Sequence, residues 1–153
     1  MRVIVQRVNF AKLFIDNSLH CQINKGILAL IGIHRNDNEK TINWMINKII
    51  NLRLFDDEQG KMNLSVKDIS GEIMLVSNFT LYGDANKGFR PTYANAAPSD
   101  IAEIIYSNFV KQFINQYPEI NIVSGVFGAM MDIELVNNGP VTILIEKEIN
   151  SKN

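Results

Sequence analysis

Three hydrogen-bonding side chains follow directly on a run that the sequence predicts to be a buried strand. The run is 72–76, which is almost entirely apolar, and Ser77, Asn78 and Thr80 come just after it. The end of a core strand is held rigidly, and such positions suit groups that must act on a bound molecule. We therefore take this segment as the first candidate for chemistry.

Two kinds of chemistry fit this segment. The hydroxyl of Thr80 could attack a carbonyl as a nucleophile, but it needs a general base, and no base stands at a suitable spacing. The backbone N–H groups of Phe79 and Thr80 could instead stabilise the oxyanion that forms when a carbonyl is attacked by water. We favour the second interpretation, and only the first requires the threonine hydroxyl.

A glycine–proline pair is the second notable feature. Gly139 and Pro140 stand between two runs with a strong strand preference, 131–136 and 141–145. Proline has no N–H for a β-ladder and fixes φ, and glycine adopts backbone angles closed to other residues. The pair predicts a stiff corner, and its simplest interpretation is the turn of a hairpin. An X-Pro bond is also the realistic place for a cis peptide.

Two further segments could border a site. Residues 83–91 form a glycine-containing, partly basic loop without the spacing of a phosphate cradle, and loops of this kind often cover a site. Residues 125–131 place small residues beside aromatic and thioether side chains. The second pattern fits either a bend packed on the core or a flat apolar slot for a planar ring.

Two amphipathic helices are predicted from apolar residues at steps of three and four. The first covers about 39–52 and is capped by Asp37 or Asn38. The second covers about 98–116. Its expected buried face consists of Ile101, Ile104, Ile105, Phe109 and Phe113.

Strands account for most of the remaining chain. They are predicted at 1–8, 13–15, 19–23, 26–33, 62–66, 72–76 and 121–126 and in the two arms of the final hairpin. The nearly continuous apolar run 26–33 fits a central strand covered on both faces. The charged residues 146–153 predict a frayed tail. We expect an α/β fold with one domain over 1–153.

Composition excludes several classes of protein. Of 153 residues, 46% are apolar and 20% are charged, as in soluble globular proteins, and no apolar run is long enough to span a membrane. A strand pattern begins at once, so no signal peptide is expected, and the single Cys21 fits a reducing compartment such as the cytoplasm. His20, His34 and the acids at 56–58 lack metal-ligand spacing, so no metal is expected. With a net charge of −1, any RNA contact should be confined to one end of the RNA.

Segments along nearly the whole chain, taken in order, resemble D-aminoacyl-tRNA deacylases. They are 1–8, 55–57, 60–65, 77–81, 87–91, 125–129 and 137–142. Any one of these segments would be weak evidence, but the ordered set extends from Met1 to about Ile145.

The resemblance implies a homodimer of mixed-sheet, barrel-like α/β subunits with two main helices. It implies hydrolysis of the ester that links a D-amino acid to the 3′ CCA end of tRNA, with no metal and no cofactor. It also implies that the Gly139–Pro140 peptide is cis and enters the active site of the partner subunit. There its carbonyl groups would meet the α-ammonium of the substrate and exclude the side chain of an L-residue.

The remaining roles are carried over by position. Ser77, Asn78, Phe79 and Thr80 match the motif that lines the scissile ester in the family. Adenosine-binding positions map onto Ala102, Phe127 and Met131.

The chain departs from the family pattern at three positions. Asn78 stands where the motif has Gln, so a side-chain hydrogen bond could be lost or bridged by water. Met130 and Asn138 each replace an Asp, and the second replacement removes a negative charge near the site.

A rigid backbone wall would discriminate chirality without reading the side chain. We therefore expect broad side-chain specificity and strict chirality, with glycine, for example glycyl-tRNA(Ala), as the substrate that slips through. Two alternatives remain open. One is a related deacylase for L- or achiral aminoacyl-tRNA, which would follow from a trans Gly139–Pro140 bond, and the other is a non-enzymatic dimer that binds RNA ends.

Overall fold

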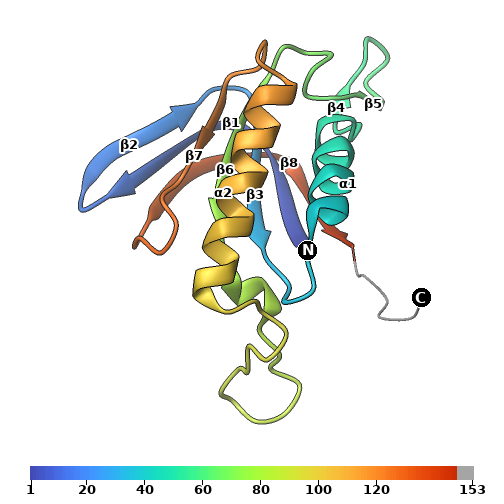
Figure 1. The fold of residues 1–153 in the computed structure, drawn as a ribbon. Coiled ribbons are helices and arrows are strands. Elements are labelled where there is room, and N and C mark those ends of the chain that lie inside the picture. The colour runs from blue at the N-terminus through green and yellow to red at the C-terminus, as the bar shows by residue number, and fades with distance from the viewer. Residues whose placement is uncertain (148–153) are drawn as a thin grey trace.

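A six-stranded mixed sheet forms the body of the chain in the computed structural model, which describes residues 1–147 (Figure 1). The strands lie in the order β2-β1-β3-β6-β7, and β8 pairs with β1. Their bounds are β1 Arg2–Ile15, β2 Ser18–Ile23, β3 Gly26–Gly32, β6 Glu72–Ser77, β7 Ile122–Ser124 and β8 Asp132–Glu146. A separate small hairpin consists of β4 Phe55–Asp56 and β5 Met62–Leu64, and only its second strand was predicted, at 62–66.

Strand β1 organises the sheet. Its first half pairs with β3, its second half pairs with β2, and both halves pair with β8, all antiparallel. The predicted break between 1–8 and 13–15 is therefore wrong, because one 14-residue strand runs through both segments. The pairs β3–β6 and β6–β7 are parallel. The resulting mixed, barrel-like sheet with two helices agrees with the fold implied by the resemblance.

Side chains alternate between two cores on the faces of the central strands. On β3, Ala29 and Ile31 point to the larger core beneath the helices, whereas Leu28 belongs to the smaller core on the other face. On β6, Leu75 belongs to the larger core and Met74 to the smaller core. The two central strands are thus covered on both sides, as their continuous apolar sequences predict.

Two helices, α1 Glu39–Ile50 and α2 Ser99–Gln116, lie on one face of the sheet (Figure 1). The Asn38 side chain caps α1 by accepting hydrogen bonds from the N–H groups of Lys40 and Thr41, so Asn38 rather than Asp37 is the cap. The carboxylate of Asp37 instead accepts hydrogen bonds from the N–H of His34 and the amino group of Met1.

The buried face of α2 is rotated from the predicted one. Phe109 and Phe113 are buried as expected, but Ile101 and Ile104 are 44% and 71% exposed. Ala102 and Tyr106 take their place in the core. Ile101 and Ile104 therefore lie on the outer side of the helix.

The predicted final hairpin is wrong, because β8 continues through the glycine–proline pair. Thr142 pairs with Gln6 and Asn137 pairs with Val8, so the residues between Asn137 and Thr142 form a bulge opposite a single residue of β1. A hairpin is not needed because β1 is long enough to pair with both arms. Glu146 still belongs to β8, so the predicted tail begins too early, and its residues 148–153 lie outside the described residues.

Candidate active site

A cleft of about 650 Å³ opens where the parallel strands β3 and β6 end. Such carboxyl ends are common ligand sites in sheets with parallel strands. Its walls come from the end of β6 and the short helix η1 (Phe79–Tyr82), from the loop leading into α2, and from the segment after β7. It is lined by Ile31, Ile33, Ser77, Asn78, Phe79, Tyr93, Ala96, Ala97, Pro98, Ser99, Ala102, Phe127, Gly128, Ala129, Met130 and Met131.

The cleft unites most of the residues that the sequence proposed for the site. Ser77, Asn78 and Phe79 line one side, and Ala102, Phe127 and Met131 also line it, although more than 20 residues separate each group along the chain. Thr80 is exposed and borders this wall without lining it.

Asn78 fixes the geometry of the first wall. Its N–H donates to the carbonyl oxygen of Ile31 over 2.7 Å, which ties the segment to the end of β3. Its Oδ1 accepts the N–H of Thr80 at 3.2 Å and the hydroxyl of Thr80 at 2.5 Å. The side chain thus caps the short helix η1. The N–H of Phe79 has no hydrogen-bond partner among residues 1–147.

An aromatic pair forms the rim beside this wall. The ring of Phe79 is 61% exposed and packs edge-on against Tyr93, with 5.1 Å between ring centroids. No sequence pattern marked Tyr93, Ala96 or Ala97 as residues of the site. These residues reach the cleft because the loop after η1 folds back, and the N–H of Ala97 donates to the carbonyl of Ile33.

The opposite wall is apolar and rests on a buried tyrosine. Phe127 lies with its ring centroid 6.0 Å from that of Tyr106, whose hydroxyl donates to the carbonyl oxygen of Leu75 over 3.0 Å. Burial raises the pKa of Tyr106, so its hydroxyl stays protonated and can donate this hydrogen bond. The segment 125–131 bends at Gly128, which has φ 76°, and its residues 127–131 form an apolar wall of the cleft.

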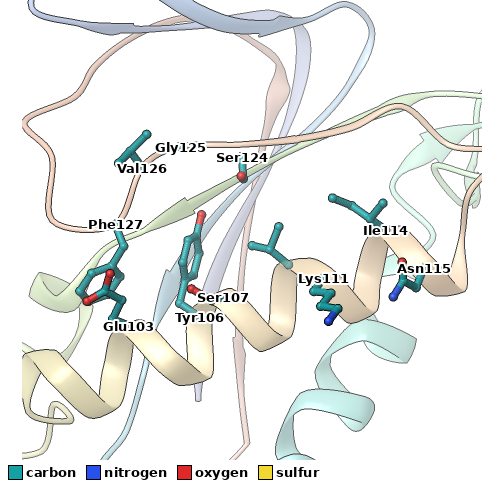
Figure 2. A pocket seen from close by; sticks show the side chains of 11 residues that line it. Glu103, Tyr106, Ser107, Lys111, Ile114, Asn115, Ser124, Gly125, Val126 and Phe127 are labelled. Atoms are coloured by element: carbon teal, nitrogen blue, oxygen red, sulfur yellow. The ribbon is translucent and has the colours of Figure 1, made fainter.

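A second, shallower hollow of about 500 Å³ lies on the other side of Phe127 (Figure 2). Figure 2 shows Glu103, Tyr106 and Lys111 along α2 on one side of this hollow and the segment 124–127 on the other. Phe127 lines both hollows and separates them.

The glycine–proline bulge lies apart from the cleft of its own chain. Gly139 and Pro140 are exposed, and neither lines the cleft. Their peptide is cis, as the resemblance implied, so the trans peptide that would have favoured the first alternative is not present.

A buried cation supports the bulge from behind. Nε of Arg7 donates to the carbonyl oxygen of Asn138 at 2.9 Å, and its Nη1 donates to the carbonyl oxygen of Leu54 at 2.6 Å. The amide of Asn137 also bridges the bulge, because it donates to the carbonyls of Arg7 and Val141 and accepts the N–H of Val141. The sequence did not identify Arg7 as important, although a cation in a buried strand is an unusual feature.

The chemistry available in the cleft is that of neutral groups. No Asp, Glu, His, Lys or Arg side chain is among the residues that line it. Within residues 1–147, no group of three or more His, Cys, Asp or Glu side chains could hold a metal ion. No helix in the same part of the chain is long and apolar enough to cross a membrane.

One protein family matches almost the whole chain. The family model described as D-Tyr-tRNA(Tyr) deacylase matches residues 4–146. The chain belongs to this deacylase family. A relative from Thermosipho africanus (strain TCF52B), named D-aminoacyl-tRNA deacylase, is 47% identical over 97% of this chain and 98% of its own length. A relative of the same name from Clostridioides difficile (strain 630) is also 47% identical, over 95% of this chain and 97% of its own length.

Solved structures resemble this member of the deacylase family over almost its full length. A protein described as c-Myc DNA Unwinding Element Binding Protein has a TM-score of 0.92 and 39% identity, and the match covers 97% of this chain and 100% of that one. A probable eukaryotic D-amino acid tRNA deacylase has a TM-score of 0.80 over 94% of this chain, but at 15% identity it shows the fold alone.

Proposed function

We propose that this chain hydrolyses the ester bond of D-aminoacyl-tRNA and releases the free D-amino acid and the tRNA. The observation that carries the proposal is the cleft, which brings the segment 77–79 of a deacylase-family chain against an apolar slot formed by Ala102, Phe127 and Met131. A planar adenine fits the slot, and the ester of the terminal ribose then faces the polar wall. This substrate belongs to translation, so we place the protein in the cytoplasm.

The reaction needs one water molecule. Water adds to the ester carbonyl carbon, negative charge develops on the carbonyl oxygen, and the bond to the ribose oxygen breaks. One proton of the water ends on the ribose oxygen and the other passes to solvent, so the amino acid leaves as a carboxylate. With no acid or base lining the cleft, the ribose 2′-OH of the substrate assists the water, and the N–H of Phe79 stabilises the oxyanion.

Chirality requires a second copy of the chain in this proposal. Because Gly139 and Pro140 do not line the cleft of their own chain, they can border a substrate only in a partner's cleft. The bulge presents backbone carbonyls on a support fixed by Arg7, and backbone yields less than a side chain would. The gate excludes L-side chains and accepts many D-side chains. Glycyl-tRNA(Ala) passes it because glycine has no side chain.

Paired hydrolysis assays test the activity. The wild-type protein is expected to deacylate D-tyrosyl-tRNA and glycyl-tRNA(Ala) and to leave L-tyrosyl-tRNA intact. Equal rates with the D- and L-esters would overturn the chirality gate, and no hydrolysis of any ester would overturn the activity.

A complementation experiment tests the second copy. Gly139→Ala chains lack a normal gate, and Phe79→Pro chains lack the oxyanion donor. Mixed dimers contain one site in which both parts are intact, so the mixture of the two impaired variants should be more active than either variant alone. If the mixture is no more active than the variants while mass spectrometry shows that mixed dimers have formed, the shared site is wrong.

A second candidate is nucleic-acid binding without catalysis. It is favoured by the 39%-identical solved structure, which is described as a protein that binds DNA. The same assays separate the two candidates, because a binding protein would retain tRNA and leave all of the esters intact.

A further inference from the structure

The loop between η1 and α2 extends away from the body of the fold (Figure 1). Its two limbs are joined by a pair of backbone hydrogen bonds between Asp84 and Thr92, with lengths of 2.8 and 2.9 Å. Oδ1 of Asp84 also accepts the N–H of Asn86. Residues 87–90 lie beyond these paired limbs, and we call them the tip.

The tip presents an aromatic ring between two cations. The Phe89 side chain is fully exposed, at 108% of its reference area, and Lys87 and Arg90 are exposed on either side. An apolar ring in water gains nothing for the stability of the free chain. A ring flanked by cations is the combination with which proteins hold single-stranded nucleic acid, because bases stack on the ring and phosphates pair with the cations.

The same loop also forms part of the cleft. Tyr93 lies four residues beyond Phe89, lines the cleft and contacts Phe79. Four residues of extended chain span at most about 14 Å. Arg35 holds the returning limb through the carbonyl of Ala94 and the side chain of Asn95. A strand of RNA that leaves the cleft by this rim therefore meets the tip within a few nucleotides.

We propose that the tip binds the single-stranded nucleotides that precede the terminal adenosine of the tRNA, with Phe89 stacked on a base and Lys87 and Arg90 on phosphates. This inference rests on the proposed function. It assigns the recognition of RNA beyond the terminal nucleoside to one loop, in a chain whose net charge of −1 offers no general attraction for RNA. Asp84 is the acid closest to the tip in sequence, and its Oδ1 accepts hydrogen bonds from the N–H and the side-chain amide of Asn86.

Three full-length variants test this proposal. Phe89→Ala removes the ring, Lys87→Ala with Arg90→Ala removes the cations, and Lys40→Ala with Lys48→Ala removes two cations from α1 as the matched control. Each is measured for the affinity of uncharged tRNA at several salt concentrations. Each is also measured for kcat and KM with D-tyrosyl-tRNA and with the minimal substrate 3′-O-D-tyrosyl-adenosine.

Loss of the tip should weaken RNA binding without slowing the chemistry. The double tip variant should bind tRNA about tenfold more weakly, and its slope of log affinity against log salt should fall by about 1.4, or 0.7 for each single-strand phosphate. Phe89→Ala should raise KM for D-tyrosyl-tRNA several-fold and leave the salt slope unchanged. Both should hydrolyse D-tyrosyl-adenosine at the wild-type rate.

The outcomes separate the two proposals. The tip does not bind RNA if the tip variants have the same affinity for tRNA as the control. It also does not bind RNA if their hydrolysis of D-tyrosyl-adenosine falls as much as their hydrolysis of D-tyrosyl-tRNA. If the wild-type protein hydrolyses neither ester, the proposed function fails. The affinity for uncharged tRNA then still decides whether the tip binds RNA.

Discussion

The hydroxyl of Thr80 lies 2.5 Å from Oδ1 of Asn78, and this oxygen also accepts the N–H of Thr80 at 3.2 Å. An amide oxygen cannot take a proton as a general base would, so this contact does not activate the hydroxyl. It also occupies one of the two backbone donors expected to meet an oxyanion. The donor left for the substrate is the N–H of Phe79.

Replacing the threonine hydroxyl should have little effect on turnover. Thr80→Ala removes the hydroxyl and keeps the backbone N–H, so we expect kcat for D-tyrosyl-tRNA within about threefold of the wild type, measured in single-turnover assays. A Thr80 nucleophile would instead require a loss on the order of 10⁶, the size seen when the nucleophile is removed from a serine hydrolase.

Removing the N–H of Phe79 should slow the chemistry strongly. Phe79 is the first residue of the short helix η1, a position where proline is tolerated, so Phe79→Pro deletes the donor with little change to the fold. We expect kcat to fall by about 10²–10³. Phe79→Ala also removes the ring but keeps the N–H, so the ratio of the two variants isolates the donor. Equal rates for the two variants would exclude it.

The polar turn after β5 should make stability depend on pH. Oδ2 of Asp68 accepts the hydroxyl and the N–H of Ser65 at 2.6 and 2.8 Å, and these bonds lower the pKa of Asp68 below that of an ordinary Asp carboxyl. Because the folded pKa is the lower one, the stabilisation is fully present above the unfolded pKa and is lost as the pH falls through the folded pKa. Asp68→Asn should therefore be less stable than the wild type at pH 7.

Urea unfolding across the acid range measures this effect. The difference in unfolding free energy between wild type and Asp68→Asn should be constant above about pH 5 and should shrink toward zero below the unfolded pKa of about 3.9. Asp132→Asn, which removes an exposed carboxylate from the start of β8, controls for the change in net charge. A difference that stays constant down to pH 2 would show that the two bonds do not depend on the charge of Asp68.

Much of the fold could be predicted because apolar periodicity reports burial. The two helices and the central strands follow from the spacing of Ile, Leu, Val and Met. Local chemistry alone could not show that Gly139 and Pro140 lie in a bulge within one continuous strand and not in the turn of a hairpin. That outcome depends on β1 being long enough to pair with both arms, which is a property of residues 130 positions away.

Apolar periodicity allowed only part of the candidate site to be predicted. Asn78 and Phe79 follow a recognisable buried strand, but Tyr93 and Ala97 belong to a loop whose path is set by tertiary contacts with Ile33 and Phe79. The rotation of α2 was also missed. Isoleucines at three- and four-residue steps predicted a buried face of the helix. In the structure Ala102 and the hydrogen-bonded Tyr106 are buried, and Ile101 and Ile104 are exposed.

Arg7 should be needed to hold the bulge in place. Its side chain is 10% exposed and donates to the carbonyls of Asn138 and Leu54, with Asp56 at 3.3 Å. A lysine has a single ammonium group and cannot reproduce this fork. Arg7→Lys should leave one buried carbonyl unpaired, at a cost of about 1–3 kcal/mol.

Thermal unfolding and the ratio of D- to L-ester hydrolysis measure the effect of Arg7→Lys. A loss of this size corresponds to a Tm lowered by about 2–4 °C for each kcal/mol in a chain of this length. The ratio should also fall, because the bulge is held less firmly. Arg53→Lys, on an exposed arginine that contacts Asn63, is the control and should change neither quantity. An unchanged ratio in Arg7→Lys would separate the bulge from chirality.

A methyl group at position 139 should disrupt the bulge itself. Gly139 has φ 152°, and a Cβ there would lie 2.4 Å from the backbone nitrogen of Val141 and 2.7 Å from its Cγ2. The nitrogen cannot move without breaking its bond to Asn137, so Gly139→Ala should lower both stability and D-ester hydrolysis, the latter by more than tenfold. Gly60→Ala is the matched control, because Gly60 also has a positive φ, 73°, but nothing within 4 Å of its Cβ. It should lose about 1–2 kcal/mol of stability from its backbone angle and keep full activity. If Gly139→Ala and Gly60→Ala lose activity equally, contact between the new Cβ and Val141 does not explain the loss at position 139.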